Sequence, residues 1–196
     1  MIPSLREIVA SLYGSWRLAR FDRTGMAYFD ESVEGFWRSF FAAILVAPIY
    51  AVMLGLRYAA QGEPGDPVHY GLIEAIGYLI SWFAFPVVML SLTGALGCRH
   101  RFVGYIVAYN WCLVLQNAVL IPLASLNAVH VLSPDAATVI WLIVVGAVMV
   151  YLWFIARAGL DVPAITAVGI VSVDVLLSLV ISAVTDNLNA IALQSS

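Results

Sequence analysis

The sequence contains no lysine and little charge of either sign. Charged residues make up 11% of the 196 residues, and hydrophobic residues make up 63%. A soluble domain of this size is about half apolar and about a quarter charged, so the composition excludes an ordinary soluble domain. All nine basic residues are arginine, a bias that suggests a GC-rich coding sequence and therefore a bacterial source.

Cysteine and histidine are too few and too scattered to form a chemical centre. Cys98 and Cys112 follow no pattern, and we interpret both as free thiols that pack like small hydrophobic residues. The three histidines, His69, His100 and His130, lie in separate loops, which predicts no metal site. The sequence also has no phosphate-binding glycine loop and no nucleophile elbow. We therefore expect no enzyme activity, no catalytic residue, no cofactor and no nucleic-acid partner.

Long apolar runs fill most of the chain and predict five membrane-spanning helices. A helix needs about 20 apolar residues to cross a bilayer, and each run reaches this length. The predicted fold class is all-α: an integral membrane bundle of five transmembrane helices after an N-terminal amphipathic interfacial helix. We expect a cytoplasmic helix and linker over 1–34, a transmembrane domain over 35–186 and a short extracytoplasmic tail over 187–196. The predicted spans cover residues 35–59, 71–96, 102–126, 136–156 and 162–185.

Residues 3–20 have the apolar spacing of an amphipathic helix. An apolar face that contains tryptophan and is followed by arginines suits a helix lying in the membrane interface. The alternative is a helix that packs on the spans of its own chain, and the sequence does not choose between the two. The residues of the predicted apolar face recur at intervals of three and four: Leu5, Ile8, Val9, Leu12 and Trp16.

Arginine is distributed unevenly between the two ends of the predicted spans. With five spans, eight arginines fall on one side and only Arg57 falls on the other. Segments rich in arginine stay in the cytoplasm under the positive-inside rule. We therefore expect a multi-pass protein of the bacterial inner membrane, with a cytoplasmic N-terminus and an extracytoplasmic C-terminus.

Two sets of residues are expected to contact other helices or lipid. The expected partners are therefore the lipid bilayer and either other membrane-protein subunits or further copies of the chain. Small residues at every fourth position of the first span would let another helix approach closely; they are Ser39, Ala43, Ala47, Ala51 and Gly55. Basic residues near the cytoplasmic face are candidates for anionic lipid headgroups, although such clusters also act simply as topology signals; they are Arg17, Arg20, Arg23, Arg99, His100 and Arg101.

The last span contains an acid near its centre, Asp174, where a charge is costly. Ser178 lies on the same helical stripe, and the third span carries Asn110, Gln116 and Asn117 at depths that bracket the acid. These amides would hydrogen-bond to Asp174 if the two spans were neighbours. One interpretation is a proton or ion relay. The other, which we favour, is a neutral acid that ties the last span to the third span or to a partner subunit.

Two segments within 70–183 carry a resemblance to a known family. In LTGALGCRHRFVGYIVAYNW (92–111) a short basic turn joins two spans, and in WLIVVGAVMVYLWFIARAGLDVPAITAVGI (141–170) a tight Ala-Gly-Leu turn joins the last two. This layout resembles the Yip1 family of five-span membrane proteins. SLYGSW (11–16) is similar to that family's DLYGP-type box, without its acid and its proline. The resemblance implies a non-enzymatic role in membrane organisation or protein–protein contact and supplies no catalytic residues.

Two hypotheses for function follow from the sequence. The first is a non-enzymatic inner-membrane protein that acts as a scaffold or accessory subunit of a membrane complex, in Yip1-like membrane organisation. The alternative is a small transporter or channel component that uses Asp174 as an intramembrane proton or ion site. A larger stable assembly after purification in gentle detergent favours the first hypothesis. Solute flux by a lone chain that depends on pH favours the second.

Overall fold

The chain is built of helices in the computed structural model, and the residues that the structure describes contain no β-strand. The described residues are 2–60, 65–129, 131 and 133–195. Five helical segments are long and apolar enough to cross a membrane, which confirms the predicted number of helices of spanning length. A helical bundle suits a lipid solvent, because lipid offers no hydrogen bonds and each span must satisfy its own backbone groups.

The helix ends differ in places from those predicted. The first span is interrupted at Phe40, and the last helix continues past residue 185 into the predicted tail. Two short 3-10 helices, η1 (Arg23–Tyr28) and η2 (Arg99–Arg101), lie in the connections. The α-helices are α1 (Leu5–Ala19), α2 (Val33–Ser39), α3 (Phe41–Ala60), α4 (Pro67–Ala95), α5 (Phe102–Ala128), α6 (Pro134–Leu160) and α7 (Ala164–Ser195).

Short polar side chains mark where several helices begin. At the start of four helices a side chain accepts a hydrogen bond from a backbone N–H of the first turn: Ser4 in α1, Ser32 in α2, Asp66 in α4 and Ser133 in α6. Such a cap satisfies a donor that has no partner within the helix. At the end of α6, Asp161 adopts the left-handed conformation with φ of 54°. This residue turns the chain directly from α6 into α7.

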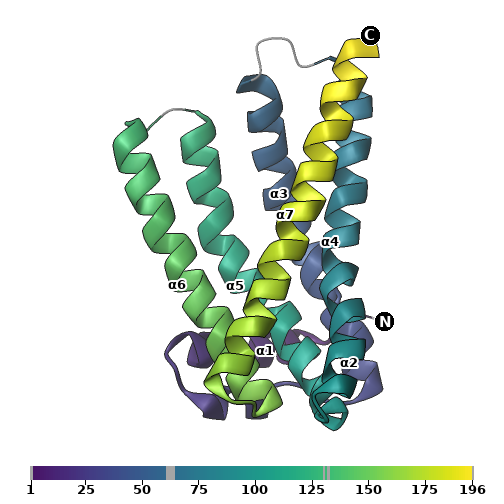
Figure 1. Ribbon diagram of the computed structural model, residues 1–196, viewed down its shortest axis with the longest axis vertical. Coiled ribbons are helices and arrows are strands. Elements are labelled where there is room, and N and C mark those ends of the chain that lie inside the picture. Colours follow the sequence, from purple (N-terminus) through teal and green to yellow (C-terminus); the bar gives the residue numbers. More distant parts are fainter. Residues whose placement is uncertain (1, 61–64, 130, 132, 196) are drawn as a thin grey trace.

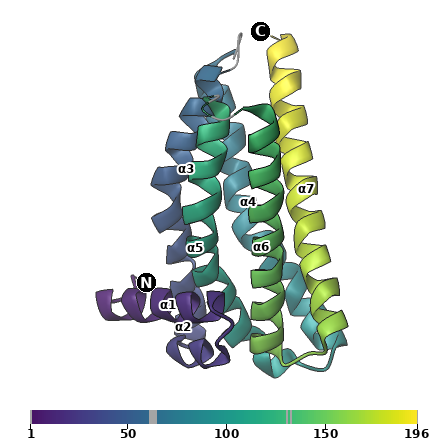
Figure 2. The same cartoon turned by 90° about the vertical axis from the view of Figure 1, so that its left-hand side faces the viewer.

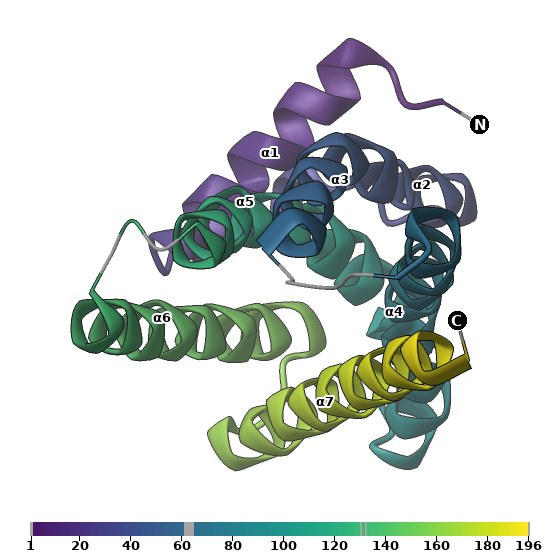
Figure 3. The same ribbon diagram turned by 90° about the horizontal axis from the view of Figure 1, so that it is seen from above.

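The bundle is tightly packed at one end and more open at the other. The first half of α5 is almost entirely buried among α1, α2, α3 and α6, whereas its second half is largely half-buried or exposed. α6 and α7 meet at the tightly packed end and diverge toward the opposite end, from the side and from above (Figure 1 and Figure 3). The C-terminus of α7 lies at this open end (Figure 1).

α1 lies crosswise to the spans at the tightly packed end of the bundle (Figure 2). Most of its inner face consists of small residues: Ser11, Gly14 and Ser15 are buried against the rest of the chain, together with Leu18 near the end of the helix. Tyr151 of α6 donates a hydrogen bond to the Ser15 carbonyl oxygen at 2.9 Å. Small side chains therefore let α1 sit directly against α5 and α6.

The structure divides the predicted apolar face of α1. Ile8 and Leu12 are half-buried and pack against the core. Leu5, Val9 and Trp16 have more than half of their surface exposed. The helix thus packs on the spans of its own chain and also presents large apolar side chains outward.

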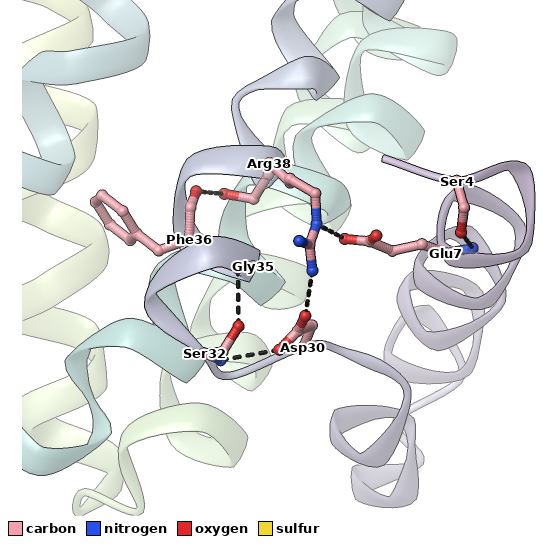
Figure 4. Close-up of polar contacts among 8 residues, drawn as sticks. Ser4, Glu7, Asp30, Ser32, Gly35, Phe36 and Arg38 are labelled. Carbon is pink, nitrogen blue, oxygen red and sulfur yellow. Dashed lines mark hydrogen bonds and ion pairs between the residues drawn. The ribbon is translucent and has the colours of Figure 1, made fainter. Parts of the chain in front are cut away.

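Arg38 fastens the N-terminal segment to the first span. Its guanidinium donates a hydrogen bond to Glu7 of α1 at 2.9 Å and pairs with Asp30 in the linker (Figure 4). Asp30 also accepts a hydrogen bond from the Ser32 backbone N–H at 3.0 Å. The bonds from Ser32, followed by the charge of Arg38, lower the pKa of the Asp30 carboxyl. Asp30 therefore stays ionised near neutral pH and remains available for the ion pair.

Candidate functional site

A tyrosine holds Asp174 inside the bundle. Asp174 lies on α7 with 8% of its surface exposed, and the Tyr109 hydroxyl of α5 donates to its Oδ1 at 2.8 Å. The Tyr109 ring lies 4.5 Å from the ring of Phe85 on α4, centroid to centroid. A buried acid needs such a donor, because its oxygens have lost contact with water. Three helices therefore meet at this acid.

Asp174 lines a cavity of about 200 Å³ between the spans. Four of the five polar residues that the sequence singles out line it, namely Asp174, Gln116, Asn117 and Ser178. The Asn117 side-chain amide donates to the Leu113 carbonyl oxygen at 2.8 Å. Gln116 Oε1 is buried and has no hydrogen-bond partner among the described residues. The cavity thus brings a carboxylate and an unused carbonyl oxygen together.

The expectation that Asn110 approaches Asp174 is wrong. Asn110 is fully buried, and its side-chain amide donates to the Ser39 hydroxyl at 2.8 Å. Consecutive residues of a helix point in directions about 100° apart, since a turn holds 3.6 residues. Asn110 and its neighbour Tyr109 therefore face different parts of the bundle. Tyr109 takes the place next to the acid, and Asn110 ties α5 to the end of α2.

A second cavity of about 260 Å³ adjoins the first and extends toward the open end. The two cavities share lining residues from α3, α4 and α7, including Tyr50 and Ser178. Glu74 also lines the second cavity and is only 4% exposed. Its carboxylate accepts hydrogen bonds from the Tyr50 hydroxyl at 2.9 Å and from the Asn189 side-chain amide at 3.0 Å. Polar side chains thus continue from Asp174 along α7 toward the C-terminal end.

The aromatic members of the site were not predicted from the sequence. Five aromatic residues line the first cavity: Tyr50, Tyr78, Trp82, Phe85 and Tyr109. A signal for three of them was present, because Tyr78, Trp82 and Phe85 recur at helical spacing on one face of α4. A buried tyrosine hydroxyl also needs a hydrogen-bond partner, which makes an intramembrane acid and an intramembrane tyrosine natural neighbours.

Arg17 is committed to bonds within the N-terminal segment. Its guanidinium donates to the Asp22 carboxylate at 2.8 Å and to the Tyr28 hydroxyl at 3.2 Å. The side chain of Thr24, followed by Arg17, donates to Asp22 and lowers the pKa of this carboxyl to about 2. These bonds hold η1 against α1, so Arg17 is less available for lipid than the sequence suggested.

The other candidates for lipid headgroups lie at the same end of the bundle. Arg23 and Arg101 approach the Asp161 carboxylate at 3.9 Å and 3.4 Å, where α6 turns into α7. These exposed pairs connect the N-terminal segment and η2 to the last turn. The remaining candidates are also exposed at this end: Arg20, Arg99 and His100.

The small-residue row of the first span is divided into a packed part and an open part. Ser39 is buried, and the Ala43 carbonyl oxygen accepts a hydrogen bond from the Tyr78 hydroxyl at 2.6 Å. Ala51 and Gly55 are exposed, and no neighbouring group lies within 4 Å of a Cβ built on Gly55. Only the part of the row near α2 therefore serves packing within the described chain.

The chain matches no family model, no curated protein and no solved structure. Within the described part of the chain, no three histidine, cysteine, aspartate or glutamate side chains gather to hold a metal ion. His130 lies outside the described residues. Function is therefore inferred from the cavities and from the exposed surfaces of this chain.

Proposed function

We propose that the chain is a non-enzymatic, multi-pass membrane protein that acts as an accessory subunit or scaffold of a membrane complex. The observation that supports this function is a cavity of about 740 Å³ between α3, α5 and α6, at the open end. Alanine is the commonest residue in its lining: Ala60, Ala124, Ala128 and Ala137. Small residues of this kind let another helix approach closely in lipid.

A transmembrane helix of a partner subunit suits this cavity better than lipid chains. Arg57 and Asn127 line it beside the alanines, and acyl chains cannot hydrogen-bond to either side chain. Helices associate in membranes through van der Waals packing and interhelical hydrogen bonds, and this cavity offers both. An acidic side chain near the end of the partner helix would pair with Arg57.

Filling the cavity should separate the chain from its partner. Ala137→Trp adds a large ring to the cavity lining, whereas Ala147→Trp adds one at an exposed position elsewhere on α6. We expect the wild-type chain and A147W to run as a larger assembly on native gels after extraction from their own membranes in gentle detergent. A137W should run as a lone chain. A lone wild-type chain, or an A137W chain that keeps its assembly, would contradict the proposal.

We propose a bacterial inner-membrane location with the N-terminus in the cytoplasm and the C-terminus outside. Eight arginines lie at the end of the bundle that carries α1, and Arg57 alone lies toward the other. The positive-inside rule then makes the α1 end cytoplasmic. Alkaline phosphatase fused at the C-terminus should be active, and a fluorescent protein that folds only in the cytoplasm should be dark there. The reverse result would overturn this orientation.

With the α1 end of the bundle in the cytoplasm, α1 would lie in the membrane interface. Its exposed Leu5, Val9 and Trp16 would enter the lipid boundary, with Arg20 and Arg99 nearby for anionic headgroups. A helix that packs against the cytoplasmic ends of the spans lies at the level of the lipid headgroups. Yip1-like membrane organisation is the form of this function that the sequence resemblance favours.

A small transporter or channel component is the second candidate function. It is favoured by the polar cavity at Asp174 and by the adjoining cavity that extends along α7 toward the open end. Intramembrane acids that face a cavity commonly mark ion or substrate pathways. In this function Asp174 would be the proton or ion site.

A further inference from the structure

The lining of the cavity at Asp174 is unusually aromatic for a polar site. Five aromatic side chains surround it, and three pairs of them are in ring contact, including the edge-on pair of Tyr78 and Trp82. Tyr50 and Tyr78 stack with centroids 4.7 Å apart, and Phe85 and Tyr109 lie 4.5 Å apart. Aromatic faces carry partial negative charge and attract cations. The rings therefore add to the attraction that a carboxylate already exerts on a positive group.

The polar atoms of the cavity favour a ligand that donates hydrogen bonds or carries positive charge. Asp174 receives one hydrogen bond, from Tyr109 at 2.8 Å. Gln116 Oε1, which is buried, has no donor among the described residues. A buried carbonyl oxygen without a partner costs free energy until a donor reaches it. An organic cation that also carries an N–H or O–H group would supply both that donor and a countercharge for the acid.

We infer that the cavity at Asp174 binds a small organic cation of the alkylammonium class. This ligand rests on the second candidate function and adds a substrate class to it; it does not depend on the accessory-subunit function. The volume of about 200 Å³ suits a compact cation. The mixture of aromatic rings and few oxygens does not resemble a site for Ca²⁺ or Mg²⁺, which take six or more oxygen ligands.

The route to the cavity also favours cations. The adjoining cavity is lined by Glu74, Asp186 and Arg57, so acids outnumber bases between Asp174 and the open end. A pathway lined by excess negative charge raises the local concentration of positive ligands. The cation would enter from the end that carries the C-terminus and reach Asp174 past Tyr50 and Ser178, which line both cavities.

Calorimetric titration of the purified full-length chain tests the inference. Dodecyl maltoside micelles are the right host, because this detergent carries no ammonium group. The probes are tetramethylammonium, choline and 3,3-dimethylbutanol, a neutral molecule of the same shape as choline. We expect saturable binding of both cations, tighter for choline because its hydroxyl can donate to Gln116 and tetramethylammonium has no donor, and no binding of the alcohol. Equal binding of choline and the alcohol, or saturation by neither cation, would overturn the inference.

Two variants locate the site. Asp174→Asn keeps an oxygen that can accept from Tyr109 but removes the charge, and the loss of charge–charge attraction should weaken choline binding about tenfold or more. Ser178→Leu fills the cavity and leaves Asp174 intact, so it should abolish binding even if D174N fails to fold. Its matched control, Ser172→Leu, changes an exposed α7 residue outside this cavity and should bind like the wild type. Choline binding that survives S178L would place the ligand elsewhere and overturn the assignment.

Flux measurements in liposomes separate this inference from the function on which it rests. Saturable choline binding without cation or proton flux would support the ligand class and contradict the transporter function. Proton flux that depends on Asp174, without choline binding, would support that function and contradict the ligand class. The full-length chain serves in both assays, so the two outcomes are directly comparable.

Discussion

Gly14→Ala is expected to lower the free energy of unfolding by about 1–3 kcal/mol, the range for overpacked contacts, and to release α1. A Cβ on Gly14 would lie 2.8 Å from the Gly25 carbonyl oxygen and 2.9 Å from Tyr28 Cβ. The closeness is mutual, because a Cβ on Gly25 would lie 2.6 Å from the Gly14 carbonyl oxygen. Backbone atoms cannot rotate out of the way, so α1 and η1 would have to separate.

Gly55→Ala is the matched control for this substitution. No neighbouring group lies within 4 Å of a Cβ at Gly55, and alanine is better than glycine in a helix by about 1 kcal/mol. G55A should therefore be neutral or slightly stabilising. Thermal unfolding followed by circular dichroism, together with the rate of trypsin cleavage after Arg20 and Arg23, would measure both effects. A G14A chain with wild-type melting and cleavage would show that the glycine contact does not hold α1.

Gly77→Ala should have the second large effect on stability, because α4 and α7 are in close contact at this glycine. A Cβ there would collide with Thr185 Cγ2, whereas Thr185 Cβ would lie at an ordinary 3.7 Å. The threonine side chain is β-branched and has few rotamers in a helix, so it cannot easily turn away. We expect a loss of about 1–3 kcal/mol in the free energy of unfolding, measured by thermal unfolding in detergent.

A double-mutant cycle makes the reason for this effect testable. Thr185→Ala removes Cγ2 and leaves only the Cβ at a comfortable distance, so it should restore most of the stability of G77A. The Thr185 hydroxyl bonds only to carbonyl oxygens of its own helix, which makes its removal inexpensive. Gly94→Ala, also on α4, has open space around it and serves as the control. Failure of T185A to rescue G77A would point to a collision other than the one with Thr185.

The predicted spans and the observed helices agree closely where hydrophobicity alone decides the structure. Every span has a corresponding helix of spanning length, because an apolar run in lipid has no alternative to internal hydrogen bonding. The ends were harder to predict. The interruption at Phe40 has no breaking residue beside it in the sequence, and α7 runs through polar residues to Ser195.

The candidate site was predictable only in part. The cost of burying a charge marked Asp174 as a residue that needs partners, and the structure places Gln116 and Asn117 in the lining of its cavity. Depth in the membrane, however, says nothing about the direction in which a side chain points. Neighbouring helices surround the first half of α5, and their packing on its different sides sets the rotation of that helix. That rotation turned Tyr109 toward Asp174 and Asn110 toward Ser39.

The sequence by itself determined that this protein is a bundle of apolar helices with its arginines gathered at one end and an acid within the last span. These properties depend on the composition and length of each segment, and not on which segments pack together. The tertiary structure alone decided which polar groups share a cavity. Tyr109 and Asp174 are 65 residues apart and Glu74 and Asn189 are 115 apart. Such pairs form only when packing has set the order and the rotation of every helix, and no local pattern encodes that outcome.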